Sequence, residues 1–263
     1  MAMTFDQYIT NPLGKSNAVL SAAVREAIRK DYTIRFNNIL LRENGRIVFY
    51  KYKTDKNSFI VHIKIPSEAV KNFYYDVVIR FYTDEKVVAA GNRLDKYNFQ
   101  AYSNDPAFVF THAFVFRKNK LFFTDLEGKM SKTALHKAPD IKNPDKQLAY
   151  VKSIYFAYLF LKNRGLFNKI TWSDAVDYDP STLIKNVMDA DEKVALRQEA
   201  EKKLDHRKKI EIDIDTAKKL SHMKHLSDDA KSRLVTTVKK TPTVRKIKAV
   251  NSTKTIKPKR KKY

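Results

Sequence analysis

The most regular alternation of apolar and polar side chains lies in the first third of the chain and predicts β-strands. Two stretches, Arg46–Lys53 and Phe59–Ile65, flank a polar turn at Thr54–Asn57, so we expect a hairpin. In the second stretch every other residue is large and apolar, which is the period of a strand with one buried face. Pro66 ends this strand, and Tyr74–Tyr82 repeats the alternation as a third strand.

The next apolar stretch has no clear period. Ala107–Arg117 carries large apolar residues at both odd and even positions, and we interpret it as a central strand buried on both faces. Lys118–Lys120 is a polar turn, and Leu121–Thr124 then forms the partner strand of a second hairpin. The stretch Ala89–Asn104 is polar and contains tyrosine, and its pattern predicts no element.

Helical spacing begins after the turn signal at Asn11–Gly14. Ser16 is the expected N-cap of a helix with one apolar face, formed by Val19, Leu20, Ala23, Val24, Ala27 and Ile28. The pattern leaves open whether this helix continues past Asp31, and Ile34–Leu41 fits either a helix or a strand. Glu43–Gly45 ends the segment with residues that favour a tight turn.

A second helix is predicted to begin at Asn143, with Asn143 as N-cap and Pro144 in the first helical position. Gly165 is its expected stop. Its apolar face comprises Leu148, Val151, Ile154, Tyr155, Tyr158, Leu159 and Leu161. These strands and helices indicate an α+β fold, an antiparallel sheet with packed helices, in a globular domain of residues 1–178.

The composition changes after Pro180. Residues 179–238 read as a charged helical extension that packs along one narrow seam, with Asp215 and Ser227 as later helix caps and with sparse apolar positions at Val187, Val194, Leu196 and Leu204. Residues 239–263 lose the helical signals and form an extended basic tail without any acidic residue. Its basic residues are Lys239, Lys240, Arg245, Lys246, Lys248, Lys254, Lys257, Lys259, Arg260, Lys261 and Lys262.

The charge of the chain points to an anionic partner. The 263 residues include 52 Lys and Arg against 29 Asp and Glu, which gives a net charge of +23. An arm of uninterrupted positive charge gains affinity for nucleic acid or an acidic protein by releasing counterions. The alternative is a solubilising end without a dedicated partner. The eleven basic residues of the tail would then be expected to bind nothing specific.

Several classes of chemistry are excluded or left without support. The chain has no cysteine, so disulfides and thiolate catalysis are excluded. Its apolar runs, such as Ile154–Leu161, are too short to span a bilayer, and no signal peptide opens it, so we expect a soluble protein without a membrane partner. The five glycines are scattered, which leaves no phosphate-binding loop and no expected cofactor.

Two patterns could carry metal chemistry, and both are weak. Asp105 followed by Glu127-Gly128-Lys129 resembles the acid and acid-x-Lys residues of a magnesium-dependent nuclease, if Asp105 precedes a strand. The six histidines form no ligand set. His62 and His112 are predicted in strands and His136 in a loop, whereas His206, His222 and His225 lie in the charged extension. No catalytic or metal-binding residue is therefore assigned.

Aromatic residues alternate with basic ones in the predicted strands. Tyr50, Tyr52, Tyr74 and Tyr82 could form a stacking platform for single-stranded nucleic acid. The same residues are also what a sheet face covered by helices requires, and that interpretation is favoured.

Three short stretches resemble particle proteins of tailed bacteriophages. They are Met3–Tyr8 with the following Asn11–Lys15, Tyr74–Val78, and Asn104–Phe110. The resemblance covers about the first two thirds of the chain and carries over no functional residue. It implies a structural component of the head, neck or tail of a virion.

The leading hypothesis is therefore a non-enzymatic assembly protein of a phage particle, assembled in the host cytoplasm and located in the virion. Its body would pack against other virion proteins in a multi-subunit assembly, and its basic arm would contact neighbouring subunits or packaged DNA. The first alternative is a cytosolic nucleic-acid-binding accessory protein. The second is the metal-dependent nuclease.

Overall fold

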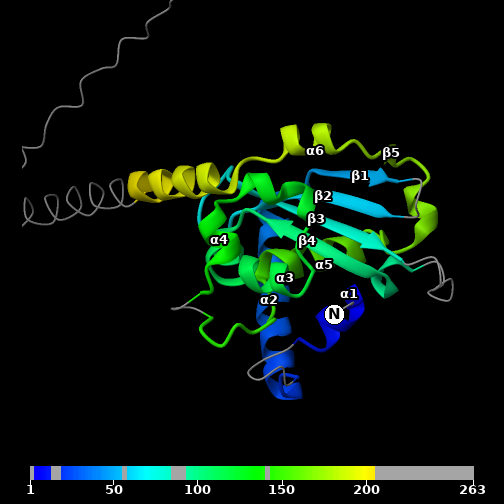
Figure 1. Cartoon of the computed structure of the whole chain (residues 1–263), viewed down its shortest axis with the longest axis horizontal. Coiled ribbons are helices and arrows are strands. Elements are labelled where there is room, and N and C mark those ends of the chain that lie inside the picture. The colour runs from blue at the N-terminus through cyan, green and yellow to red at the C-terminus, as the bar shows by residue number, and fades with distance from the viewer. Residues whose placement is uncertain (1–2, 13–18, 55–57, 84–92, 140–142, 205–263) are drawn as a thin grey trace, which may run out of the picture. The chain divides into compact units, whose positions relative to one another are not determined.

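A mixed sheet organises the part of the chain that the structure describes (Figure 1). The five strands found there have the order β4-β3-β2-β1-β5. The first four are antiparallel neighbours, and β5 pairs with β1 in parallel. Their bounds are β1 Phe49–Lys53, β2 Phe59–Pro66, β3 Tyr74–Tyr82, β4 Asn98–Ser103 and β5 Val176–Asp177. With its helices the chain has an α+β fold, as the sequence predicts.

The computed structural model describes residues 3–12, 19–54, 58–83, 93–139 and 143–204. The chain divides into two compact units, Met1–Lys203 and Leu204–Tyr263. All of the described residues except Leu204 belong to the first unit.

One face of the sheet is apolar and is covered by helices. Alternate residues of β2, β3 and β4, among them Val61, Ile79 and Phe99, point to this face and are fully buried. Phe5 packs its ring edge-on against Phe99 at 5.1 Å. The covering helices are α1 Phe5–Thr10, α2 Ala22–Arg42 and α5 Lys152–Asn163. The predicted hairpin of β1 and β2 and the third strand are confirmed.

The predicted strand Ala107–Arg117 is wrong, because this segment is helical. The π-helix η4 Phe108–His112 runs directly into α3 Ala113–Lys118. The carboxylate of Asp105 accepts a hydrogen bond from the Ala107 amide at 3.0 Å, so Asp105 and Pro106 start a helix here. The predicted hairpin with Leu121–Thr124 is absent too, and only an isolated parallel bridge joins Phe122 to Ala101 of β4.

The second helix begins later than predicted. Its first residue is Lys152 rather than Pro144, although it ends before Gly165, whose φ of +66° fits the expected stop. Asn143 closes a turn instead of a helix, since its side-chain oxygen Oδ1 accepts from the Gln147 backbone amide at 2.8 Å. Its amide group donates to the carbonyl of Thr111 at 3.2 Å, which ties this turn to η4.

The first helix also differs from the prediction. Helix α2 is continuous through Asp31 and is capped by Ser21, whose hydroxyl accepts from the Val24 amide at 3.4 Å. The predicted cap Ser16 lies outside the described residues. The expected apolar face is largely exposed, and the buried residues of α2 are Phe36 and Ile39 instead. The segment Ile34–Leu41, whose pattern fits either a helix or a strand, is therefore helical.

The remaining short elements include β4, which lies in the stretch that the sequence left unassigned. They are η3 Leu94–Lys96, η5 Thr124–Lys129, α4 Lys132–His136, η6 Lys169–Trp172 and α6 Pro180–Asn186, and residues 190–204 are helical as well. Within the ranges given above, no helix combines the length and the apolarity needed to cross a bilayer.

The compact unit extends beyond the expected boundary at residue 178. Leu183, Val187 and Ala190 are buried in the same core as the sheet, and the unit ends at Lys203. Of the predicted apolar positions in the helix at 190–204, Val194 is buried, whereas Leu196 is exposed. Lys193 stands over the ring of Phe73 at 4.6 Å, and Arg197 stands over that of Tyr75 at 5.6 Å.

Neighbouring residues of α6 provide a direct test of this extension. Leu183 is fully buried, whereas Ile184 is 38% exposed. We expect Leu183→Ala to lower the free energy of unfolding by about 2–4 kcal/mol, because it leaves a cavity in a packed core. The matched Ile184→Ala substitution should cost well under half of that. Urea denaturation followed by circular dichroism measures both, and equal small losses would show that α6 is not part of the core.

Candidate functional site

The predicted binding residues of the C-terminal tail are not part of the described structure. The eleven Lys and Arg of residues 239–263 lie outside it, as do His206, His222 and His225 and the predicted caps Asp215 and Ser227. The other candidates can be placed, and the structure adds a site that the sequence did not indicate.

The residues of the nuclease pattern take other positions. Asp105 precedes a helix rather than a strand, and its carboxylate caps that helix. Glu127 and Lys129 lie in the 3-10 helix η5, and Glu127 pairs with Arg117 at 3.2 Å. The acid-x-Lys pair is thus not on a strand next to Asp105. In the described part of the chain, no group of three or more His, Asp or Glu could hold a metal ion.

The three described histidines lie in three different elements. His62 lies in β2 as predicted, but His112 lies in the π-helix η4 and not in a strand. His136 is the last residue of α4 rather than a loop residue. Burial lowers the pKa of His112 to about 4, so this ring is neutral at physiological pH.

The second face of the sheet carries a buried carboxylate, Asp76. Its Oδ1 lies 2.9 Å from Nε2 of His62 and accepts from Nζ of Lys64 at 3.1 Å. Its Oδ2 accepts from the side-chain amide of Asn104 at 2.8 Å and from the backbone amide of Met188 at 3.3 Å. Strand β2, the residue after β4 and the segment before the last helix therefore converge on one carboxylate.

These contacts keep Asp76 ionised. Burial alone would raise the pKa of its carboxyl, but the hydrogen bonds and charges of His62 and Lys64 outweigh burial and hold it at about 2. An Asp–His pair can orient a catalytic base, but here both side chains are buried and Nδ1 of His62 faces no hydrogen-bond partner. The geometry is that of a structural tie between the sheet and the segment that follows α6.

Arg80 forms a second polar contact on this face. Its guanidinium donates to Asp125 at 2.8 Å and lies 4.3 Å from the ring centre of Phe123. The hydroxyl of Tyr178 donates to the same carboxylate at 2.6 Å. Because Asp125 already neutralises Arg80, the shallow hollow beside it does not present a free charge to a ligand.

The predicted tyrosine platform is mostly closed. Tyr52 is buried and packs against Tyr178, with ring centres 6.2 Å apart. Tyr50 remains exposed on one side and packs on His62 with its other side. Tyr74 and Tyr82 are half-buried, so the four rings together do not form one open platform.

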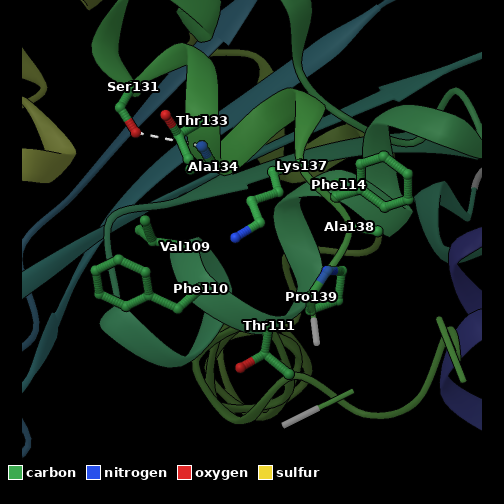
Figure 2. A pocket seen from close by; sticks show the side chains of 10 residues that line it. All are labelled: Val109, Phe110, Thr111, Phe114, Ser131, Thr133, Ala134, Lys137, Ala138 and Pro139. Atoms are coloured by element: carbon green, nitrogen blue, oxygen red, sulfur yellow. Dashed lines mark hydrogen bonds between the residues drawn. The ribbon is translucent and has the colours of Figure 1, made fainter. Parts of the chain in front are cut away.

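An apolar groove lies between η4, α3, α4 and the segment that follows α4 (Figure 2). Its volume is about 510 Å³. We call it the groove and define it by its lining residues, Val109, Phe110, Thr111, Phe114, Ser131, Thr133, Ala134, Lys137, Ala138 and Pro139. Ser131 caps α4, since its hydroxyl accepts from the Ala134 amide at 3.3 Å, and this cap fixes one wall.

The π-helix shapes the other wall. A π-turn widens a helix locally, and such turns recur at functional sites. In η4, Phe108 and Val109 are buried, whereas Phe110 turns outward and is 59% exposed. A large aromatic ring half in water next to a hollow is a typical feature of a binding surface.

One basic residue, Lys137, lines the groove. Lys132 and Lys137 are exposed on the α4 side, and the Lys137 side chain extends across the hollow in Figure 2. The lining holds three hydroxyl groups and one ammonium group but no carboxylate or imidazole. Such a surface can bind an apolar side chain with an adjacent carboxylate, and it has no general base for catalysis.

Sequence reasoning missed the groove because its walls come from two segments that share no motif. The stretch Asn104-Asp105-Pro106 was the available signal, since it combines an N-cap residue with proline at the first helical position. Interpreting it as a helix start would have placed Phe110 on a helix surface rather than in a buried strand.

The Asp76 contacts predict an acid-sensitive stability. The folded pKa of about 2 lies below the ordinary value of 3.8, so the stabilisation is complete above about pH 4 and is lost as the pH falls towards 2. By linkage the loss is about 2 kcal/mol. We expect the gap in unfolding free energy between the native chain and Asp76→Asn to close by this amount over that interval.

Urea titrations at a series of pH values measure this gap. Asp145→Asn serves as the control, because its carboxylate is exposed and accepts from the neutral side chain of Gln147. This variant should leave the pH dependence nearly parallel to that of the native chain. A gap between the native chain and Asp76→Asn that stays constant with pH contradicts the role given to the Asp76 carboxylate.

Comparison of the chain with protein-family models, curated proteins and solved structures found no match. Its function is therefore inferred from its own residues and contacts.

Proposed function

We propose that this chain is a non-enzymatic structural component of a bacteriophage particle. Its α+β unit packs against other protein subunits, and its basic segment 239–263 contacts neighbouring subunits or packaged DNA. The chain thus acts by binding, with no cofactor and no catalytic residue.

The distribution of charge is the observation that carries the proposal. Residues 239–263 contribute eleven positive charges and no negative ones, whereas residues 1–203 carry 33 Lys and Arg against 23 Asp and Glu. Concentrating charge in a short terminal segment repels other copies unless an anionic surface neutralises it. Packaged DNA or an acidic subunit supplies that surface.

The described body supports binding rather than catalysis. Its buried Asp–His pair is enclosed and ties two segments together, and no carboxylate or imidazole lines its apolar groove. The exposed surface offers an apolar groove with Lys137 in its lining, which suits contact with another protein. The resemblance of Met3–Tyr8 and Tyr74–Val78 to particle proteins points to the same class.

A cytosolic nucleic-acid-binding accessory protein is the second candidate, because the same basic segment would serve it. The two differ in selectivity. An assembly protein needs only charge, so its DNA affinity should fall steeply with salt and show no preference for a sequence or a nucleic-acid form. A dedicated binder keeps a preference at physiological salt.

Replacing the basic segment tests the proposal. We expect truncation after Val238 to weaken binding to duplex DNA and to reduce the slope of log affinity against log salt by about 0.9 for each phosphate that the segment would have neutralised. Fluorescence anisotropy across a salt series measures both. A full-length control with Gln at the eleven Lys and Arg positions keeps the length and removes the charge. Unchanged affinity in both variants would falsify the role of this segment.

Location provides an independent test. A structural component should be present in purified virions at a fixed ratio to the other particle proteins. Quantitative mass spectrometry of purified virions against infected-cell lysate measures this ratio. Enrichment in the lysate with absence from the particle would favour the cytosolic accessory protein.

A further inference from the structure

Helix α2 carries large apolar side chains on two opposite faces. Its inner face packs on the body, where Phe36 and Ile39 are buried and the ring centre of Phe36 lies 5.6 Å from that of Phe156 in α5. Its outer face is exposed to water in the described part of the chain. The body therefore accounts for the apolar residues of only one of the two faces.

The outer face has the spacing of a contact between two helices. We define the outer stripe as six exposed residues of α2 that follow one another at alternating intervals of three and four, namely Val24, Ala27, Asp31, Ile34, Asn38 and Leu41. Val24, Ile34 and Leu41 are 47%, 51% and 77% exposed. Single exposed apolar residues need no explanation, but this period along a whole helix is that of the seam between packed helices.

The apolar pattern of the sequence indicates the same surface. The apolar face predicted for this helix includes Ala23, Val24 and Ala27, and all three are exposed. Figure 1 shows that the N-terminal half of α2 extends beyond the sheet. An apolar face is thus present where the described body supplies no surface to cover it.

The charge in the middle of the stripe is already balanced within one copy. The Asp31 carboxylate accepts from the Arg35 guanidinium at 3.2 Å. Arg35 also donates to both carboxylate oxygens of Glu68, at 2.6 and 2.9 Å. Asp31 therefore enters an interface with its own cation and does not require one from the other molecule.

The charges of α2 decide how a second copy of the helix would lie against the stripe. In a parallel arrangement, Asp31 would face Asp31 of the second copy, and the exposed Lys30 would lie beside Arg35 of that copy. Both contacts place like charges together, which disfavours the parallel arrangement.

An antiparallel arrangement removes both conflicts. The opposed pairs across the two copies are then Val24 with Leu41, Ala27 with Asn38, and Asp31 with Ile34. The flanking Lys30 lies beside Asn37 of the second copy instead of beside an arginine. The opposed helix dipoles also favour this direction. The stripe therefore fits a second copy of itself.

We propose that two copies of the chain form a dimer in which their α2 helices pack antiparallel along the outer stripes. The contact uses the same surface on both copies, so it has two-fold symmetry and closes at two subunits. This inference rests on the proposed function, since it specifies one contact by which subunits of a particle component join.

The size of the contact sets its strength. The stripe and the positions that flank it supply about a dozen residues from each copy, about half of the roughly 20–30 residues on each side of a standard interface. We therefore expect a reversible dimer with a dissociation constant in the micromolar range.

Cross-linking through introduced cysteines tests the direction of packing. The chain has no cysteine of its own, so the introduced thiols are the only ones present. A mixture of full-length Val24→Cys and Leu41→Cys should form a disulfide-linked dimer that contains both variants. Each variant alone should form little dimer, because its own cysteine lies about 25 Å along the helix axis from the equivalent cysteine in the second copy. Non-reducing electrophoresis and intact mass spectrometry measure the products.

Ile170→Cys is the matched control for cross-linking. Ile170 is 72% exposed and lies in η6, away from α2 in the sequence and in the fold. Mixed with either α2 variant, it should give only the dimer that random collision produces. Efficient cross-linking of Val24→Cys by itself would indicate parallel helices and contradict the proposed arrangement.

Sedimentation velocity of the full-length chain tests the contact without a cross-link. We expect the native chain to dimerise as its concentration rises. Ile34→Glu should weaken dimerisation about tenfold or more, because it places a carboxylate opposite Asp31 of the second copy at two symmetric positions. Ile170→Glu makes the same change outside the stripe and should leave dimerisation near the native value. Circular dichroism confirms that both variants are folded.

Three results overturn the inference. They are a native chain that stays monomeric at every concentration reached, a mixture of Val24→Cys and Leu41→Cys that cross-links no better than the Ile170→Cys control, and equal weakening by Ile34→Glu and Ile170→Glu. None of these results bears on DNA binding or on presence in virions, so a failure of this inference is distinguishable from a failure of the proposed function.

Discussion

The second face of the sheet depends on the contacts that the buried Asp76 carboxylate makes with its neighbours. The apolar face of the sheet is held by area burial, and many residues share that task. The second face instead gathers charged and polar groups from three parts of the chain around one buried carboxylate. A buried charge is tolerated only when its partners are all in place, so this point demands a single arrangement of the surrounding segments.

The strands of the hairpin and β3 could be predicted because one of their faces is buried and their residues alternate accordingly. The segment Ala107–Arg117 could not, since aromatic and β-branched residues fill most positions and its pattern leaves no polar phase to count. The local start signal decides its conformation, because the Asp105 carboxylate accepts from the Ala107 amide two residues later and begins a helix. The predicted start of α5 was wrong although the sequence signal was clear. Asn143 has a side chain that suits an N-cap, but this side chain closes a turn instead.

The candidate surfaces also differ in how far the sequence predicts them. The basic segment 239–263 can be recognised in the sequence because it depends only on composition. The groove forms where η4 packs near the segment that follows α4, and no spacing of residues in the sequence predicts that these two segments lie together.

The seam of the helix at 190–204 has a mechanical consequence. Everything C-terminal to it is joined covalently to the body through this helix, which contacts the body by the buried side chains of Ala190 and Val194 and by two cations over aromatic rings. Tension on the terminal segment would therefore enter the body along a row of few bonds, loaded one after another from the outer end. A row of contacts breaks at lower force when it is pulled apart one contact at a time than when all contacts are loaded together. The direction of the force would therefore decide whether the helix stays bound to the body.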